Sequence, residues 1–145
     1  MTLLKISAAA ALLACTGLAQ AQSTLGELLD RGAQKLTPAE ARAQAPLTVM
    51  RDTIDADARI TLRPDGTVVG KVENKQGHGS SEARGTWTVD ASGKRCLDVN
   101  MPDFRMQWNE CNYPYRLGTQ VFSVPSDTDR DARATAYVLT AYVRQ

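Results

Sequence analysis

The only histidine in the chain, His78, lies just before a pair of serines, Ser80 and Ser81. A histidine beside a serine can act as the general base that activates the hydroxyl, so one hypothesis is a hydrolase that uses His78 with Ser80 or Ser81. A nucleophile and its base usually come from separate elements, however, because neighbours in sequence seldom reach the required geometry. The glycines on both sides of His78 favour an exposed loop histidine, and we assign no catalytic residue.

The acidic run at 127–131 has the D-x-D-x-D spacing of a calcium-binding loop. It departs from that loop at the sixth position, which is Ala132 instead of glycine, and at the twelfth, which is Val138 instead of glutamate. A single histidine also cannot complete a usual zinc site with two cysteines. We therefore expect a charged surface turn here, with no metal site and no cofactor.

Cys96 and Cys111 are the two cysteines that remain if an N-terminal leader is removed, and the residues around them alternate with the period of a strand. An antiparallel hairpin with Cys96 opposite Cys111 also places Val99 opposite Trp108, so that apolar residues face one another. This register predicts one structural disulfide. Closing the loop should stabilise the fold by about 3 kcal/mol in the chain-entropy model.

Aromatic residues gather in the central part of the chain. Trp87 and Trp108 fall on the inward face of predicted strands, where core packing is the default. Phe104, Tyr113 and Tyr115 fall in or beside predicted loops. If these three are exposed together, they would form an aromatic rim at one end of the fold, and exposed aromatic side chains suit recognition of a partner.

Residues 1–21 have the layout of a secretory signal peptide, with Lys5 in a short basic region, an alanine-rich apolar stretch, and an A-x-A cleavage site at 19–21. The apolar stretch is too short for a membrane-spanning helix, so we expect no transmembrane segment. The residues before Cys15 also resemble a lipobox, in which Cys15 would be acylated. The expected location is periplasmic or secreted in a bacterium, with a lipoprotein as the alternative.

Charge limits the choice of partners. Only Lys5 of the 17 Lys and Arg residues lies in the leader, so cleavage leaves 16 basic and 16 acidic residues. A formally neutral mature chain argues against nucleic acid or an anionic membrane as the main partner, since both select basic surfaces.

Two short helices are expected in residues 22–46. T-x-x-E capping boxes begin at Thr24 and Thr37, and Pro46 ends the second helix. From 47 to 145 the period changes to two, which predicts a β domain.

A hairpin is predicted with its turn at Asp65-Gly66. The segment 74–83 is polar and is expected to be a loop, Tyr113-Pro114 is expected to break a strand, and 134–143 is expected to be a long final strand. About eight strands joined by short turns predict a mainly β fold, a single antiparallel meander or small barrel with two short N-terminal helices.

Part of this pattern resembles a family of small exported bacterial proteins of unknown function. The shared features are a D-G-x strand turn, a G-x-W strand and two cysteines that bracket a tryptophan. They lie at Asp65, Gly66, Thr67, Gly85, Thr86, Trp87, Gly93, Cys96, Trp108, Cys111, Tyr115 and Gly118. More distantly the layout is similar to lipocalin-like barrels, although lipocalins carry their G-x-W on the first strand. The resemblance implies a scaffold and no particular chemistry.

The preferred hypothesis is a non-enzymatic binding or inhibitory module of the cell envelope, whose partner is an unknown protein or small ligand. The alternatives are the hydrolase with His78 and a structural envelope lipoprotein acylated at Cys15.

Overall fold

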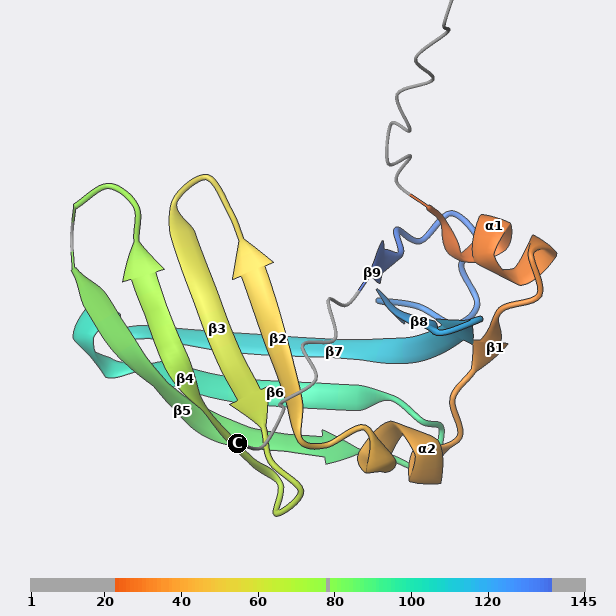
Figure 1. Ribbon diagram of the computed structural model, residues 1–145, viewed down its shortest axis with the longest axis horizontal. Helices are drawn as coiled ribbons and strands as arrows, with labels where there is room; N and C mark the ends of the chain where they lie inside the picture. Colours follow the sequence, from red (N-terminus) through yellow and green to blue (C-terminus); the bar gives the residue numbers. More distant parts are fainter. Residues whose placement is uncertain (1–22, 78, 137–145) are drawn as a thin grey trace, which may run out of the picture.

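Antiparallel strands form the body of the protein. The computed structural model describes residues 23–77 and 79–136, which contain nine strands. Strands β2 to β9 follow one another across the sheet in chain order, which confirms the predicted meander, and the short β1 pairs with β7 (Figure 1). The strands are β1 Gln34–Lys35, β2 Leu47–Asp52, β3 Ala56–Leu62, β4 Thr67–Asn74, β5 Ser80–Val89, β6 Arg95–Met101, β7 Met106–Leu117, β8 Gln120–Val124 and β9 Thr135–Ala136.

The predicted signal peptide over residues 1–21, with Cys15, lies outside the described residues. The same holds for the predicted final strand beyond Ala136. Among the residues that are described, no helix is both long and apolar enough to cross a membrane.

Both predicted N-terminal helices are present, and each begins at its capping box. The hydroxyl of Thr24 accepts a hydrogen bond from the amide of Glu27, whose carboxylate accepts one from the amide of Thr24. Thr37 and Glu40 exchange the same pair of bonds. These bonds satisfy amides that a helix start leaves without partners. The helices are α1 Leu25–Asp30, α2 Pro38–Ala43 and the single 3₁₀ turn η1 Pro102–Phe104.

The registers of the two predicted hairpins are confirmed. Leu62 pairs with Val68 across the turn that contains Gly66, which has a positive φ of 84°. Cys96 pairs with Cys111 and forms the predicted disulfide with it. The alternation of apolar and polar residues therefore fixed both registers, because a slip of one residue would turn every side chain to the opposite face.

The prediction of a polar loop over 74–83 is wrong in its second half, because β5 already begins at Ser80. Glu82 and Arg84 are exposed on the outer face of this strand, whereas Ser81 and Ala83 are buried. The buried serine hides the alternation, since a polar residue occupies a position that faces the core.

The prediction that Tyr113-Pro114 breaks the strand is also wrong, because β7 continues through both residues. At this point β7 changes partners: Asn112 is the last residue paired with β6, and Tyr113 is the first paired with β8. Pro114 lacks only its own N–H, and its carbonyl still accepts a hydrogen bond of 2.9 Å from the amide of Leu36. The strand tolerates a proline here because the pairing with β6 has already ended at Asn112, so no ladder bond from the missing N–H is lost.

The sheet curls into a half-barrel whose concave face carries the larger core (Figure 1). Two glycines permit a close approach of neighbouring strands. A Cβ atom on Gly70 would lie 2.2 Å from the carbonyl oxygen of Arg59, and one on Gly85 would lie 1.9 Å from that of Asp98. A smaller apolar cluster, which includes Leu25, Leu28, Tyr115, Phe122 and Val124, packs α1 against β7 and β8.

The two ends of the half-barrel differ. At one end α2 packs near β5, where the guanidinium of Arg42 donates to the carbonyl of Val89 at 2.6 Å. The buried side chain of Arg95 donates there to Gln44 at 3.3 Å. The β2–β3, β4–β5 and β6–β7 connections lie at the opposite end, because consecutive turns of a meander alternate between the ends. Helix α2 thus covers one end and leaves the other to these connections.

Candidate functional site

The candidate site lies where the two sides of the half-barrel face each other. The first strand of the curl, β2, and residues 106–112 of β7 are not paired with each other. Two long side chains connect them instead: the Arg51 guanidinium donates to the Glu110 carboxylate at 2.7 Å. We call the space between β2 and residues 106–112 of β7 the seam.

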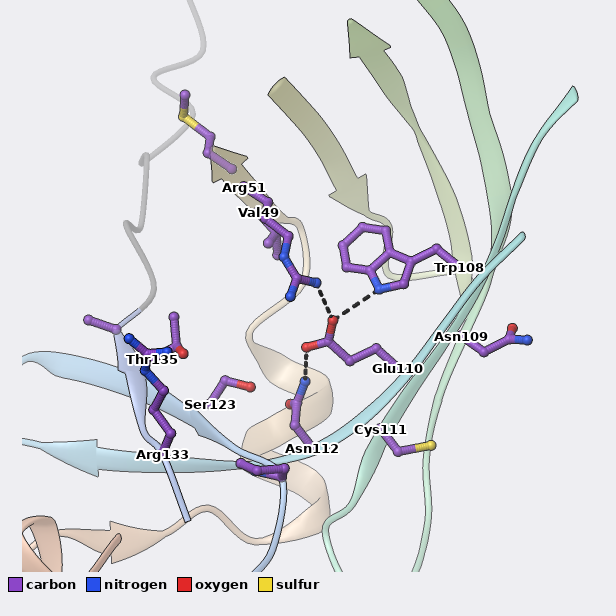
Figure 2. A pocket seen from close by; sticks show the side chains of 13 residues that line it. Val49, Arg51, Trp108, Asn109, Glu110, Cys111, Asn112, Ser123, Arg133 and Thr135 are labelled. Atoms are coloured by element: carbon purple, nitrogen blue, oxygen red, sulfur yellow. Dashed lines mark hydrogen bonds and ion pairs between the residues drawn. The ribbon is translucent and has the colours of Figure 1, made fainter. Parts of the chain in front are cut away.

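Glu110 is the centre of the polar contacts at the seam. Its carboxylate also accepts hydrogen bonds from the indole N–H of Trp108 at 3.0 Å and from the side-chain amide of Asn112 at 3.4 Å. The Arg51 guanidinium lies 5.2 Å from the centre of the Trp108 ring, within the range of a cation–π contact. Arg51 and Trp108 therefore hold each other and Glu110 in one arrangement (Figure 2).

A groove of about 640 Å³ lies along the seam. Strand β2 lines it with Val49 to Arg51, and β7 lines it with Trp108 to Asn112. Figure 2 shows Arg133 and Thr135 on the side of the groove opposite Glu110. We call this space the seam groove.

A second cavity, of about 600 Å³, opens at the end of the half-barrel away from α2. Its walls are mainly apolar and include Ala58 and Val72 from β3 and β4 and Met101, Phe104, Met106 and Trp108 from β6, η1 and β7. We call it the mouth cavity. Arg51 and Trp108 line both spaces, so their contact forms the boundary between the mouth cavity and the seam groove.

The predicted aromatic rim is not formed. Phe104 packs against the larger core and lines the mouth cavity. Tyr113 and Tyr115 instead belong to the smaller cluster around α1, and only 4% of Tyr115 is exposed. Burial raises the pKa of the Tyr115 phenol above its usual range. The expectation failed because it treated residues 112–115 as a loop, whereas the strand continues and turns Tyr115 inward.

The serines of the hydrolase hypothesis lie on β5, and His78 lies outside the described residues. Ser80 is exposed. Ser81 is 1% exposed, and its hydroxyl donates to the carbonyl of Glu82 at 3.0 Å and accepts from the amide of Asp103 at 3.2 Å. The bond from Asp103 joins η1 to β5, so the hydroxyl of Ser81 has a structural use.

The acidic turn pairs with a lysine. Asp127 accepts a hydrogen bond of 2.8 Å from Lys35 in β1, and this bond lowers the pKa of Asp127 and raises that of Lys35. Asp129 accepts from the amide of Asp131 at 3.0 Å. Over residues 23–77 and 79–136, no group of three or more His, Cys, Asp and Glu side chains could hold a metal ion.

The sequence did not single out Arg51 or Glu110. One signal was present, because Glu110 falls between Trp108 and Asn112 on the inward face of a predicted strand, where a charge needs a partner. Its partner is 59 positions away, and only the curl of the sheet brings the two together.

Comparisons of the chain with protein-family models, with curated proteins and with solved structures found no match. The resemblance to small exported proteins therefore stays a prediction, and the function has to be argued from the geometry of the two cavities.

Proposed function

We propose that this protein is a non-enzymatic binding module of the cell envelope that holds the apolar part of a small ligand in its mouth cavity. The observation that carries this proposal is the apolar cavity of about 600 Å³ at the end of the half-barrel that α2 leaves open. Ligand sites in proteins usually have about 300–1,000 Å³ and apolar walls with a few polar groups at the edge.

The composition of the walls supports an adaptable site. Met101 and Met106 are unbranched and polarisable, so they fit ligands of different shape. Met106 is 57% exposed, so its side chain lies at the surface beside the cavity. Ala58 occupies a position on the concave face where a larger side chain would fill the space.

The proposed location is the periplasm or the exterior of a bacterium. The disulfide supports it, because such bonds persist mainly in oxidising compartments. Mass spectrometry of the mature N-terminus tests the location. Cleavage after Ala21 predicts a chain that begins at Gln22, whereas a lipoprotein would begin at an acylated Cys15.

A titration with N-phenyl-1-naphthylamine, a neutral fluorophore that brightens in apolar sites, tests the binding function. We expect saturable binding to the wild-type protein. Ala58→Phe should abolish it by filling the cavity, and Phe104→Ala should weaken it about tenfold through loss of ring contact.

The matched control is Tyr113→Ala, which removes an aromatic side chain from the smaller cluster and should leave binding unchanged. Thermal unfolding of each variant establishes that it is folded. The proposal fails if the wild-type protein gives no saturable signal, or if Tyr113→Ala weakens binding as much as Phe104→Ala.

A further inference from the structure

One edge of β2 faces the seam without a strand beside it in the part of the chain that the structure describes, because β2 pairs with β3 alone. In an antiparallel strand, successive residues turn their backbone N–H and C=O groups to opposite edges. The amide of Thr53 donates to the carbonyl of Ala56, so Thr53 faces β3. By this alternation the backbone groups of Met50, three residues earlier, face the seam.

Strand β8 pairs with the facing edge of β7 over the second half of that strand. The carbonyl of Pro114 accepts from Leu36, next to β1, so even-numbered residues of β7 face the β6 and β1 side. The odd-numbered residues face the other side, where β8 pairs from Tyr113 onward. Among the described residues, the same edge has no strand beside it at Gln107 and Asn109.

We propose that the seam accepts an extended peptide segment of a partner protein as an added strand. The segment would lie between the two edges, in line with β8, and pair with β2 through the backbone. Addition of a strand to an exposed edge is an established mode of peptide recognition, in which the main chain supplies affinity and alternate side chains supply specificity. The groove of about 640 Å³ between the two edges provides the room.

Charge narrows the chemistry of the peptide. Glu110 is already paired with Arg51 at 2.7 Å. Arg133, on the opposite side of the groove, is exposed and forms no ion pair with any described residue (Figure 2). The groove therefore offers a positive charge, and the segment it fits carries a glutamate or aspartate toward Arg133.

This interaction rests on the two strand edges and not on the mouth cavity, so it can fail while the proposed small-ligand function holds. The test uses a fluorescein-labelled heptapeptide in which valine alternates with threonine around one central glutamate, with fluorescence anisotropy as the readout. The control peptides carry N-methyl groups on alternate amides, in either phase, or glutamine in place of the glutamate.

We expect the full-length protein to bind the unmodified peptide, and N-methylation in one of the two phases to weaken binding about 100-fold by removing main-chain donors. Met50→Pro should weaken binding about fivefold or more, because it removes a seam-facing N–H from an edge strand that tolerates proline. Met50→Ala keeps that N–H and should bind as the wild type does. Arg133→Ala should remove the preference for glutamate over glutamine, which we expect to be about threefold to fivefold.

Three outcomes overturn the proposal. The first is the absence of peptide binding by the full-length protein. The second is equal binding of the unmodified peptide and both N-methylated peptides, because the main chain would then not be used. The third is binding only by a chain ended after Ala136, because residues 137–145 of the protein itself would then be the occupant. The peptide controls keep the test decisive if Met50→Pro does not fold.

Discussion

Lys35 and Asp127 join two segments that are far apart in the chain. Lys35 lies in the short strand β1, and Asp127 lies in the loop that follows β8. Their hydrogen bond of 2.8 Å lowers the pKa of Asp127 below its ordinary value of 3.8. The Lys35 ammonium also lies 5.3 Å from the centre of the Tyr113 ring. The pair thus fixes β1 beside the smaller cluster.

This pair predicts a specific dependence of stability on pH. Because the pKa of Asp127 is lower in the folded state, its contribution is present above 3.8 and is lost as the pH falls through the lowered folded value. Asp127→Asn should therefore flatten the loss of stability on the acid side, as measured by urea unfolding between pH 2 and 6. Asp131→Asn, in the same loop but without an ion pair among the described residues, is the control. Equal pH profiles for wild type and Asp127→Asn would contradict this assignment.

Contacts between single side chains on unpaired strands were the features that the sequence predicted least well. Trp87 and Trp108 were assigned to inward faces, and Trp87 is indeed 7% exposed in the core. Trp108 faces inward as well, but it lies at the boundary of two cavities. That difference depends on Arg51, which arrives from the other side of the curl, and no local pattern records a contact between strands that are not paired.

The β6–β7 hairpin contains the disulfide bond. The Cys96–Cys111 disulfide closes a loop with a sequence separation of 15. Replacing both cysteines by serine should lower the free energy of unfolding by about 3 kcal/mol, because the unfolded chain regains the entropy of that loop. Urea unfolding measures the loss. Reduction of the wild-type disulfide should produce a loss of the same size, and a much smaller effect of either change would show that the hairpin is held mainly by its packing.

The curl of the sheet depends on the close approach of two strands at Gly85. A methyl group on Gly85 would lie 1.9 Å from a backbone carbonyl oxygen, which cannot move aside as a flexible side chain could. Gly85→Ala should therefore destabilise the protein by about 3 kcal/mol, within the upper range for overpacked sites. Thr86→Ala changes the neighbouring exposed position and should cost much less. If both variants have equal thermal stability, the strands separate at Gly85 more easily than we infer.

Elements that depend on neighbouring residues could be predicted from the sequence. Elements that depend on contacts with distant parts of the chain could not. The capping boxes at Thr24 and Thr37 and the disulfide register follow from residues within one turn or one hairpin. The start of β5 at Ser80 was missed because its buried Ser81 is satisfied by Asp103 in η1, more than twenty positions away. The pairing of β1 with β7 could not be predicted either, because a strand of two residues shows no detectable alternation and its partner is distant in the chain.

Because of where its walls come from, the mouth cavity couples ligand binding to the stability of the entire fold. Its walls come from both sides of the curl, from β3 and β4 on one side and from β6 and β7 on the other. No single hairpin contains the site, so a ligand that occupies it can bind only when the entire half-barrel is folded. A ligand that binds only the folded state stabilises that state by mass action.

A ligand in the mouth cavity should therefore raise the unfolding temperature of the whole protein. At a free ligand concentration 100 times the Kd, the expected stabilisation is about 2.7 kcal/mol, which a thermal scan with N-phenyl-1-naphthylamine would detect. Ala58→Phe should abolish the shift. Leu28→Ala, in the smaller cluster, should lower the unfolding temperature of the ligand-free protein. The increase on adding ligand should remain, because the two clusters share β7 and should unfold together. A transition that splits in two with ligand, with only one part shifted, would show that the smaller cluster unfolds independently of the half-barrel.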